Sequence, residues 1–286
     1  MWVRSHTQSS VHTLQNPLQT PQKPQLRVID ESFAGSADLG TGISAALMRR
    51  VARGQIAPTV RLHRTGPILA FGRLDKLRPG YAKAVGIARE HGYEPVERLA
   101  GGRAAVFHEG TISFSHATQA AGAYAGTRPR FEEMAGQIAA ALGGLGADAR
   151  VGEVEGEYCP GEFSVNARGA VKLAGIGQRV ITGGAHVGGV VVLRGAGRIR
   201  EVLTPIYEAL ELDWKPETTG SLAAEIGESD ETVPAGTADQ LIERAIASLR
   251  EVLAESYELS DAQLDDDTRA LAAELRSDHA PQTSRN

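Results

Sequence analysis

The segment VKLAGIGQRVITGGAHVGGVVVL, residues 171–193, contains two strand-like runs on either side of Thr182-Gly183-Gly184. Valine, isoleucine and leucine dominate both runs, and such residues fit the pleated surface of a strand. A glycine-containing turn between two short apolar runs is typical of two neighbouring strands. The segment therefore predicts a strand pair, with the rest of a sheet around it.

Other strands and helices are expected on both sides of this pair. Further strands are predicted at 26–30, at 59–64 and 67–71 as a strand–turn–strand around Thr65-Gly66, and as two short strands around a glycine pair within 97–117. Helices are predicted at 43–54, 81–91, 131–142 and 238–253. Strands mixed with helices, with several hairpin-like connections, indicate an α/β or α+β fold with a mixed central β-sheet flanked by helices.

The helix at 238–253 has the clearest pattern. Thr237 and Gln240 have the spacing of a capping box. Its apolar positions fall on one helical face: Leu241, Ile242, Ala245, Ile246, Leu249, Val252 and Leu253. Further along, the acidic run 265–267 is either a solvated surface or the start of a helix.

Composition narrows the functional class. The 286 residues carry a net charge of −5, so no chain-wide positive field attracts nucleic acid or an acidic membrane surface. A single cysteine argues against a disulfide scaffold and fits a reducing compartment. No apolar run has the length of a transmembrane helix. We therefore expect a soluble cytoplasmic protein that binds neither nucleic acid nor membrane.

The chain is expected to divide into three parts. Residues 1–25 are rich in Gln, Ser, Thr and Pro, a composition typical of disorder. Residues 26–255 are expected to form one folded domain, because their length suffices for a large core. Residues 256–286 are expected to be a helical or flexible tail.

The lone cysteine, Cys159, lies in a Cys-Pro-Gly sequence that favours a turn. A thiol in a turn is accessible, and nearby cations such as Arg168 or Lys172 favour its thiolate. Free cysteines are equally often inert buried residues that pack like small apolar side chains. The local sequence leaves both interpretations open.

Two further features concern charged groups near glycines. Lys172 lies in a short apolar strand, where it is either solvated on an outer face or buried with a partner or a function. In the segment 98–103, paired glycines between two arginines permit close backbone approach to a ligand, although such a pair is more often a plain turn. The histidines His108, His116 and His186 have no metal-ligand spacing, so no metal site is predicted.

In combination, these motifs resemble the biotin/lipoate protein ligase catalytic-domain superfamily. The resemblance rests on five segments in order: LHRTGPILAFGRLD (62–75), RLAGGRAAVFHEGTISFS (98–115), EYCPGEFSV (157–165), GAVKLAGIGQR (169–179) and KPETTGSLAAEIG (215–227). A Cys-Pro-Gly turn followed by Lys-x-Ala-Gly-x-x-Gln is a specific combination. It places the chain closest to the octanoyl amidotransferase branch, which is related to lipoate-protein ligase A. The resemblance implies the class II synthetase-like fold of that superfamily over residues 26–255.

The resemblance also implies a mechanism. Cys159 would take an octanoyl (or lipoyl) group from a lysine of a carrier, the glycine cleavage H protein, as a thioester. A lysine on a lipoyl domain of a 2-oxoacid dehydrogenase would then accept the group. Lys172 would polarise the acyl carbonyl or help to deprotonate the thiol. The remaining predicted substrate-site residues are Arg98, Gly101, Gly102, His108, Gly175, Gly177 and Gln178. No cofactor is expected, and we expect a monomer.

Departures from the family pattern leave alternatives open. Ala100 replaces a usual serine, Arg103 a small or apolar residue, and Ser164 a frequent acidic residue, while His108 replaces an aspartate of the closest branch. The main alternative is a lipoate-protein ligase on the same fold, which would need ATP and Mg²⁺ and would make Cys159 incidental. A non-catalytic protein that binds lipoyl domains is a further alternative. A biotin ligase is disfavoured because a GRGRxGR-like loop is lacking, and no fixed spacing supports an unrelated cysteine hydrolase.

Overall fold

A central sheet of eight strands forms the middle of the protein in the computed structural model, which describes residues 22–282 except 33–34, 121, 123–125 and 234–238. In spatial order the strands are β11 (Glu258–Asp261), β1 (Gln25–Ser32), β2 (Thr59–Arg64), β6 (Thr111–Gln119), β10 (Gly184–Val192), β9 (Val171–Ile181), β8 (Val165–Ala167) and β7 (Ala149–Val151). β1 pairs in parallel with β11 and β2, and the other neighbours are antiparallel. The mixed sheet and the central β9–β10 pair are confirmed.

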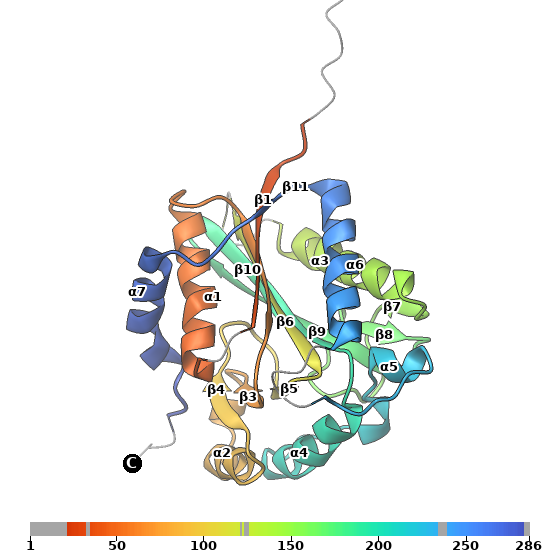
Figure 1. The fold of residues 1–286 in the computed structure, drawn as a ribbon. Coiled ribbons are helices and arrows are strands. Elements are labelled where there is room, and N and C mark those ends of the chain that lie inside the picture. Colours follow the sequence, from red (N-terminus) through yellow and green to blue (C-terminus); the bar gives the residue numbers. More distant parts are fainter. Residues whose placement is uncertain (1–21, 33–34, 121, 123–125, 234–238, 283–286) are drawn as a thin grey trace, which may run out of the picture.

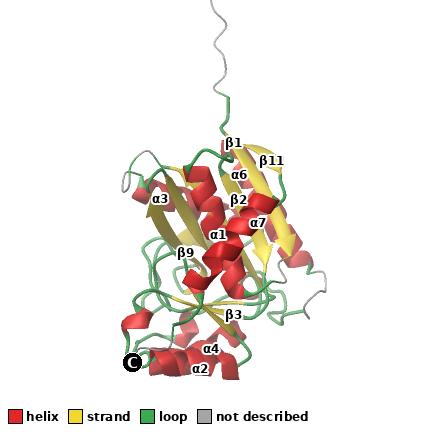
Figure 2. Ribbon diagram, turned by 90° about the vertical axis from the view of Figure 1, so that its left-hand side faces the viewer, coloured by secondary structure: helices red, strands yellow, loops and turns green. Residues whose placement is uncertain are grey.

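Helices cover both faces of this sheet (Figures 1 and 2). The helices α1 (Ala37–Ala52) and α7 (Asp266–Leu275) pack together on one face, and α3 (Thr127–Gly144) and α6 (Gln240–Ser256) pack together on the other. A second sheet has the strand order β4 (Glu94–Glu97), β3 (Ile68–Phe71) and β5 (Ala105–Phe107), and it is flanked by α2 (Tyr81–Glu90) and α4 (Ala196–Ala209). Short helical turns are η1 (Asp75–Leu77), η2 (Pro216–Thr218), α5 (Leu222–Glu225) and η3 (Arg276–His279).

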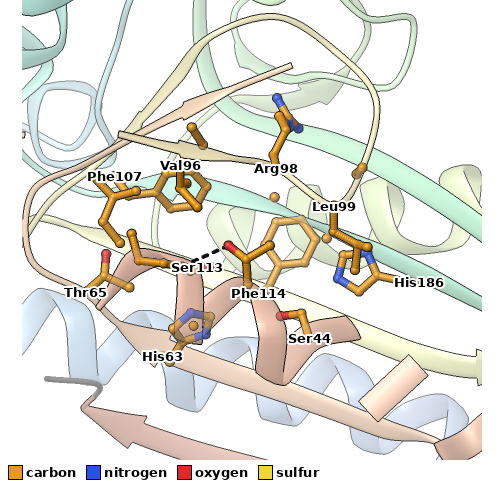
Figure 3. Close-up of a pocket in the computed structure, with 18 residues that line it drawn as sticks. Ser44, His63, Thr65, Val96, Arg98, Leu99, Phe107, Ser113, Phe114 and His186 are labelled. Carbon is orange, nitrogen blue, oxygen red and sulfur yellow. Dashed lines mark hydrogen bonds between the residues drawn. The ribbon is translucent and has the colours of Figure 1, made fainter. Parts of the chain in front are cut away.

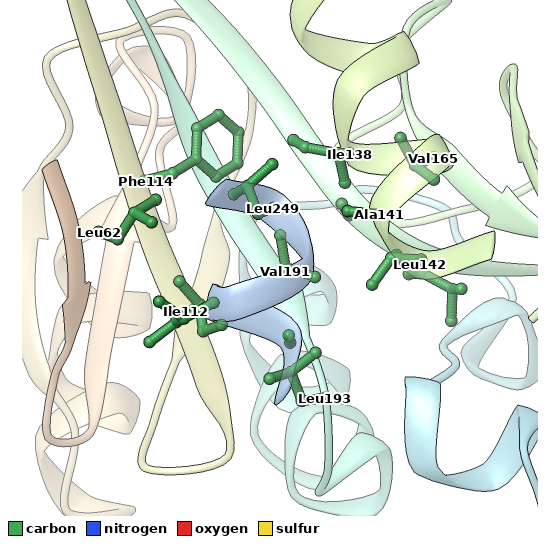
Figure 4. Close-up of a cluster of buried hydrophobic side chains, with 14 of the residues drawn as sticks. Leu62, Ile112, Phe114, Ile138, Ala141, Leu142, Val165, Val191, Leu193 and Leu249 are labelled. Atoms are coloured by element: carbon green, nitrogen blue, oxygen red, sulfur yellow. The ribbon is translucent and has the colours of Figure 1, made fainter. Parts of the chain in front are cut away.

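The main hydrophobic core lies between the central sheet and the α3–α6 pair (Figure 4). Alternate residues of β6 and β10 point into it, including Ile112, Phe114 and Val191. Ile138 of α3 and Leu249 of α6 meet them from the helical layer. Alternation puts polar residues of the same strands, such as Ser113, on the opposite face, where they line a cavity.

The strands predicted at 59–64 and 67–71 are present as β2 and β3, but they do not pair with each other across Thr65-Gly66. β2 pairs with β1 and β6, whereas β3 pairs with β4 and β5 in the other sheet. Both edges of each strand are therefore used by other partners, and the chain crosses from one sheet to the other at Thr65-Gly66. The glycine pair 101–102 likewise lies in a loop from β4 to β5, two strands that flank β3 and do not pair with each other.

Helix α1 begins at Ala37, six residues before the predicted start at Ile43. The sequence suggested a later start because Gly40 and Gly42 weaken a helix. Gly42 has a packing reason, since a Cβ there would lie 2.6 Å from the carbonyl oxygen of Ala272 in α7. The close approach of α1 and α7 therefore depends on that glycine.

Replacing Gly42 by alanine is expected to lower the free energy of unfolding by about 1–2 kcal/mol, because overpacking against α7 outweighs the gain in helix propensity. Gly136, in α3, is the matched control, because a Cβ there meets nothing within 4 Å. Gly136→Ala should stabilise by about 0.5–1 kcal/mol. Chemical denaturation of both variants measures the difference, and equal stabilisation by both would contradict the packing role of Gly42.

The starts of α6 and α7 can be compared with the sequence expectations. Asp239 caps α6 by accepting from the amide of Leu241, while Thr237 of the expected capping box lies outside the described residues. The acidic run starts α7, with Asp265 as its cap.

Residues 1–21 also lie outside the described part, and the division of the chain into three parts stays a prediction. Within the described part, no helix is both long and apolar enough to cross a membrane.

Candidate active site

Lys172 is brought inside the protein by strand β9, and its side chain is fully buried. All three of its ammonium hydrogens have acceptors: Glu157 Oε1 at 2.9 Å, the carbonyl of Tyr158 at 3.0 Å and the carbonyl of Cys159 at 2.7 Å. The interpretation of Lys172 as a solvated surface residue is therefore wrong. The lysine is tied directly to the turn that carries the cysteine.

Cys159 has a left-handed backbone conformation, with φ at +44°. A non-glycine residue in this region is strained by about 1–3 kcal/mol and needs support from its surroundings. Its amide donates to the hydroxyl of Tyr207 at 2.7 Å, and that hydroxyl donates to the carbonyl of Ala104 at 3.1 Å. Its carbonyl accepts from Lys172. Both peptide groups of Cys159 are thus fixed by residues from other elements.

The sulfur of Cys159 faces positive groups. It accepts from the amide of Arg103 at 3.2 Å and from Nη1 of Arg98 at 3.5 Å. Burial alone would raise the pKa of the Cys159 thiol, but the charges of Arg98 and Lys172 and the Arg103 amide lower it below the usual value. The site therefore favours a thiolate, the reactive form of cysteine.

The loop between β4 and β5 is shaped to reach this sulfur. Nη1 of Arg98 donates to the carbonyl of Arg103 at 3.0 Å, which closes the loop around the glycine pair. Arg103 forms an ion pair at 3.3 Å with the buried Asp75, and Asp75 also accepts from the amide of Gly72 at 2.8 Å. Burial raises the pKa of Asp75, while the Gly72 amide and Arg103 act in the opposite direction.

Gly102→Ala is expected to slow the reaction of Cys159 with iodoacetamide at pH 7 by about tenfold, a change equivalent to one pKa unit. Gly102 has a φ of +109°, and a Cβ there would lie 2.8 Å from the Cys159 sulfur. Gly101→Ala is the control, because a Cβ at Gly101 meets nothing within 4 Å and should leave the alkylation rate unchanged. Equal rates in both variants would contradict the close approach.

An interior cavity lies on the other side of Arg98 (Figure 3). It holds about 640 Å³ of empty space, part of it open to solvent. Figure 3 shows Val96, Arg98 and Leu99 on one side and Ser44 and His63 on the other. Most of its other walls are apolar or lack a side chain: Ala37, Gly40, Ile68, Ala70, Ala100, Phe107, Phe114, Gly188 and Gly189.

The interior cavity lies next to a second, smaller space that reaches the cysteine. A narrow space of about 260 Å³ is lined by Cys159 and Lys172 and shares Arg98, Phe107 and Gly189 with the interior cavity. On the outer side of Cys159 lies an open groove of about 1150 Å³, which we call the outer groove. Its lining residues are Gly101, Gly102, Thr127, Phe131, Cys159–Ser164 and Ile176–Val180. Cys159 therefore stands between an interior cavity and an exterior groove.

The predicted site residues mostly come together. Arg98 contacts the sulfur, a Cβ at Gly102 would lie 2.8 Å from it, and a Cβ at Gly175 would lie 3.2 Å from Lys172. Gly101, Gly177 and Gln178 line the outer groove. Gln178 also accepts from Nε of Arg130 at 2.9 Å and donates to the carbonyl of Thr127 at 3.0 Å, so it anchors the start of α3. Their roles in binding stay predictions.

His108 is the exception. It is fully buried, and its Nδ1 accepts from the amide of Gly110 at 3.0 Å. Its ring packs against Gly195, at the start of α4, and close to Thr232. It lines neither the cavity nor the groove that meet at Cys159. The turn after β5 thus places His108 apart from the cysteine, and its role in substrate binding stays a prediction.

Three residues of the site were missed from the sequence. Glu157 pairs with Lys172, Tyr207 holds the Cys159 amide, and Asp75 holds Arg103. Tyr207 and Asp75 are distant in sequence from the groups they bind, and no local pattern marks them. Glu157 lies two residues before the cysteine, and an acid that close to the candidate nucleophile was the available signal. Among the described residues, no three His, Cys, Asp or Glu side chains are grouped as metal ligands.

Comparison with known proteins gives concordant matches. The family model described as the lipoyl protein ligase A/B catalytic domain matches residues 41–258. The octanoyl-[GcvH]:protein N-octanoyltransferase of Geobacillus kaustophilus is 32% identical over 191 residues, 65% of this chain and 67% of that protein. The protein of the same name from Anoxybacillus flavithermus is 33% identical over 182 residues, 63% of this chain and 65% of that protein. The matched segments thus span about two thirds of each relative.

Solved structures agree at the level of the fold. A lipoate-protein ligase A bound with ATP has a TM-score of 0.63 at 15% identity, covering 90% of this chain and 95% of its own. A bi-partite lipoate protein ligase from Thermoplasma acidophilum has a TM-score of 0.60 at 16% identity, covering 90% and 92%. These likenesses confirm the mixed-sheet catalytic-domain fold that the sequence motifs implied.

Proposed function

This chain belongs to the lipoyl protein ligase A/B catalytic-domain family, and from that premise we propose that it transfers an octanoyl (or lipoyl) group between lysines of carrier proteins through a thioester on Cys159. The observation that carries the proposal is the position of the Cys159 sulfur. It lines both the outer groove and a narrow space that adjoins the interior cavity, among groups that favour its thiolate. The relatives named octanoyl-[GcvH]:protein N-octanoyltransferase support the glycine cleavage H protein as the donor.

In the first step, the thiolate of Cys159 attacks the carbonyl carbon of an octanoyl-lysine amide on the donor. A carbon–sulfur bond forms and the carbon–nitrogen bond breaks, and the lysine nitrogen leaves as an amine with a proton taken from solvent, which balances the proton that the Cys159 thiol released to solvent on ionising. In the second step, the amine of a lysine on a lipoyl domain attacks the thioester. The amide forms again, the thiol of Cys159 is released, and no nucleotide is consumed.

We assign the acyl chain of the substrate to the interior cavity and the carrier lysines to the outer groove. The acyl chain would enter the interior cavity, whose walls at Ile68, Val96 and Phe107 are apolar, past the arginine–glycine loop. The two carrier lysines would approach in turn from the outer groove. This arrangement allows the carriers to exchange while the acyl group stays bound to Cys159.

The charged groups would stabilise charge that develops at the sulfur and at the acyl oxygen. Arg98 and Lys172 act on the thiolate. Because Lys172 donates three hydrogen bonds, we assign it the role of a fixed ammonium and not of a base. Backbone amides between Gly175 and Gly177 are the proposed donors to the oxyanion.

The test is the intact mass of the protein after incubation with octanoylated H protein in the absence of ATP. We expect an adduct of octanoyl mass that is removed by hydroxylamine and is absent in Cys159→Ala. If octanoate or lipoate modifies a lipoyl domain only when ATP is supplied, and equally in Cys159→Ala, the protein is a ligase. If neither assay gives product while a lipoyl domain still binds, it is a non-catalytic binding protein.

A further inference from the structure

Glu157 is a buried carboxylate next to the nucleophile that the proposed mechanism does not use. Its side chain is fully buried and accepts four hydrogen bonds. Oε1 accepts from Lys172 Nζ at 2.9 Å, from Ser164 Oγ at 2.5 Å and from the amide of Gly161 at 3.2 Å, and Oε2 accepts from the amide of Val154 at 3.1 Å. We propose that Glu157 is the positioning residue that holds Lys172 and the Cys159 turn in their reactive arrangement.

These four contacts enclose the cysteine. Val154 precedes Cys159 in the chain, Gly161 follows it, and Lys172 reaches it from strand β9. A single carboxylate therefore ties both ends of the turn to the lysine that binds the carbonyl of Cys159. The left-handed conformation of Cys159 requires such external support. Glu157 thus acts on the sulfur through Lys172 and the turn and does not touch it.

The ion pair between Glu157 and Lys172 also matters for the charge near the sulfur. Lys172 and Glu157 are both fully buried, and a buried charge without its partner is strongly unfavourable. Without the carboxylate, the Lys172 side chain would lose its buried counter-ion and move away from the cysteine turn. That movement would withdraw a positive charge that lowers the pKa of the Cys159 thiol. Glu157 therefore maintains the reactivity of the cysteine as well as its position.

Ser164 offers a way to test the position of the charge. Its Oγ lies 2.5 Å from the Glu157 oxygen that contacts Lys172. An aspartate at position 164 is one bond longer than serine, so its carboxylate would reach the place that this oxygen occupies. The carboxylate can therefore be supplied from either side of the turn.

Alkylation by iodoacetamide reports on this arrangement without any acyl donor, because the chain has one cysteine. The charged or titratable groups around the sulfur are Arg98 from the loop after β4, Lys172 from β9, Glu157 and Tyr158 from its own turn, and Tyr207 from α4. We expect Glu157→Gln to move the pH midpoint of alkylation upward by about one unit, because Lys172 is then displaced and the thiolate loses an opposite charge, which shifts a pKa by about that much. Octanoyl adduct formation at pH 7 should fall about tenfold.

The double variant E157S/S164D, which relocates the carboxylate, should restore the midpoint and the adduct rate to within about threefold of the wild type, a residual of less than 1 kcal/mol. Glu155→Gln is the matched control, because Glu155 lies in the same loop with an exposed side chain and should change neither value. An unshifted midpoint in folded Glu157→Gln would overturn the proposal. So would a double variant that does not fold or keeps the raised midpoint.

The inference deepens the proposed function and rests on it for the adduct measurement alone. If the wild-type protein forms no octanoyl adduct while the alkylation midpoints shift and recover as expected, the acyl transfer proposal fails and the positioning role of Glu157 stands. If the wild type forms the adduct and the alkylation midpoints do not shift, the acyl transfer proposal stands and the positioning role of Glu157 fails.

Discussion

Lys172→Met is expected to abolish the octanoyl adduct on Cys159 and to lower the free energy of unfolding by about 3–5 kcal/mol, the usual cost of breaking a buried ion pair. The variant leaves the Glu157 carboxylate buried without its counter-ion. It also removes the donor to the carbonyl of Cys159. Chemical denaturation measures the loss of stability, and intact mass after incubation with octanoylated H protein measures the loss of the adduct.

A second variant separates the two effects. In K172M/E157Q the buried charge is removed together with its partner, so most of the lost stability should return. The adduct should stay absent, because the positive charge beside the sulfur is still missing. Adduct formation by K172M at the wild-type rate would contradict the proposed role of Lys172.

Arg98→Gln is expected to raise the pKa of the Cys159 thiol by about 1–2 units, because the variant removes an opposite charge next to the thiolate. The sign follows from the charged form of the cysteine. Arg98 stabilises the anion, so the folded protein binds the thiol proton less tightly with the arginine than without it. At pH 7 the variant should form the acyl adduct about 10–100 times more slowly, since each pKa unit is a factor of ten in thiolate.

The pH dependence of the rate of adduct formation identifies why Arg98→Gln is slow. Raising the pH toward 9 should recover much of the rate of Arg98→Gln, because the thiolate then forms without help. Arg73→Gln is the control, since Arg73 is an exposed arginine on the loop after β3 and should keep the wild-type profile. A loss in Arg98→Gln that does not change with pH would show that the arginine acts by closing its loop through Arg103 and not through its charge.

Much of the fold could be predicted from local patterns. The two apolar runs around Thr182-Gly183-Gly184 predicted β9 and β10, and the apolar face of residues 241–253 predicted α6. α4 was missed because Pro205, together with Gly195 and Gly197 at its start, suggests a break. Burial of Ile199 and Val202 against the second sheet outweighs that local preference.

Part of the candidate site could likewise be predicted from the sequence, and part could not. The sequence by itself marked Cys159 and Lys172 as candidates, because a Cys-Pro-Gly turn followed by Lys-x-Ala-Gly-x-x-Gln resembles one family, while the local features alone left their roles open. Only the tertiary structure decided that the two touch, that Arg98 faces the sulfur and that His108 does not. It also brought in Glu157 and Tyr207. The physical reason is that hydrogen-bond partners and counter-ions are chosen by proximity in space, and buried polar groups must find them wherever the strands place them.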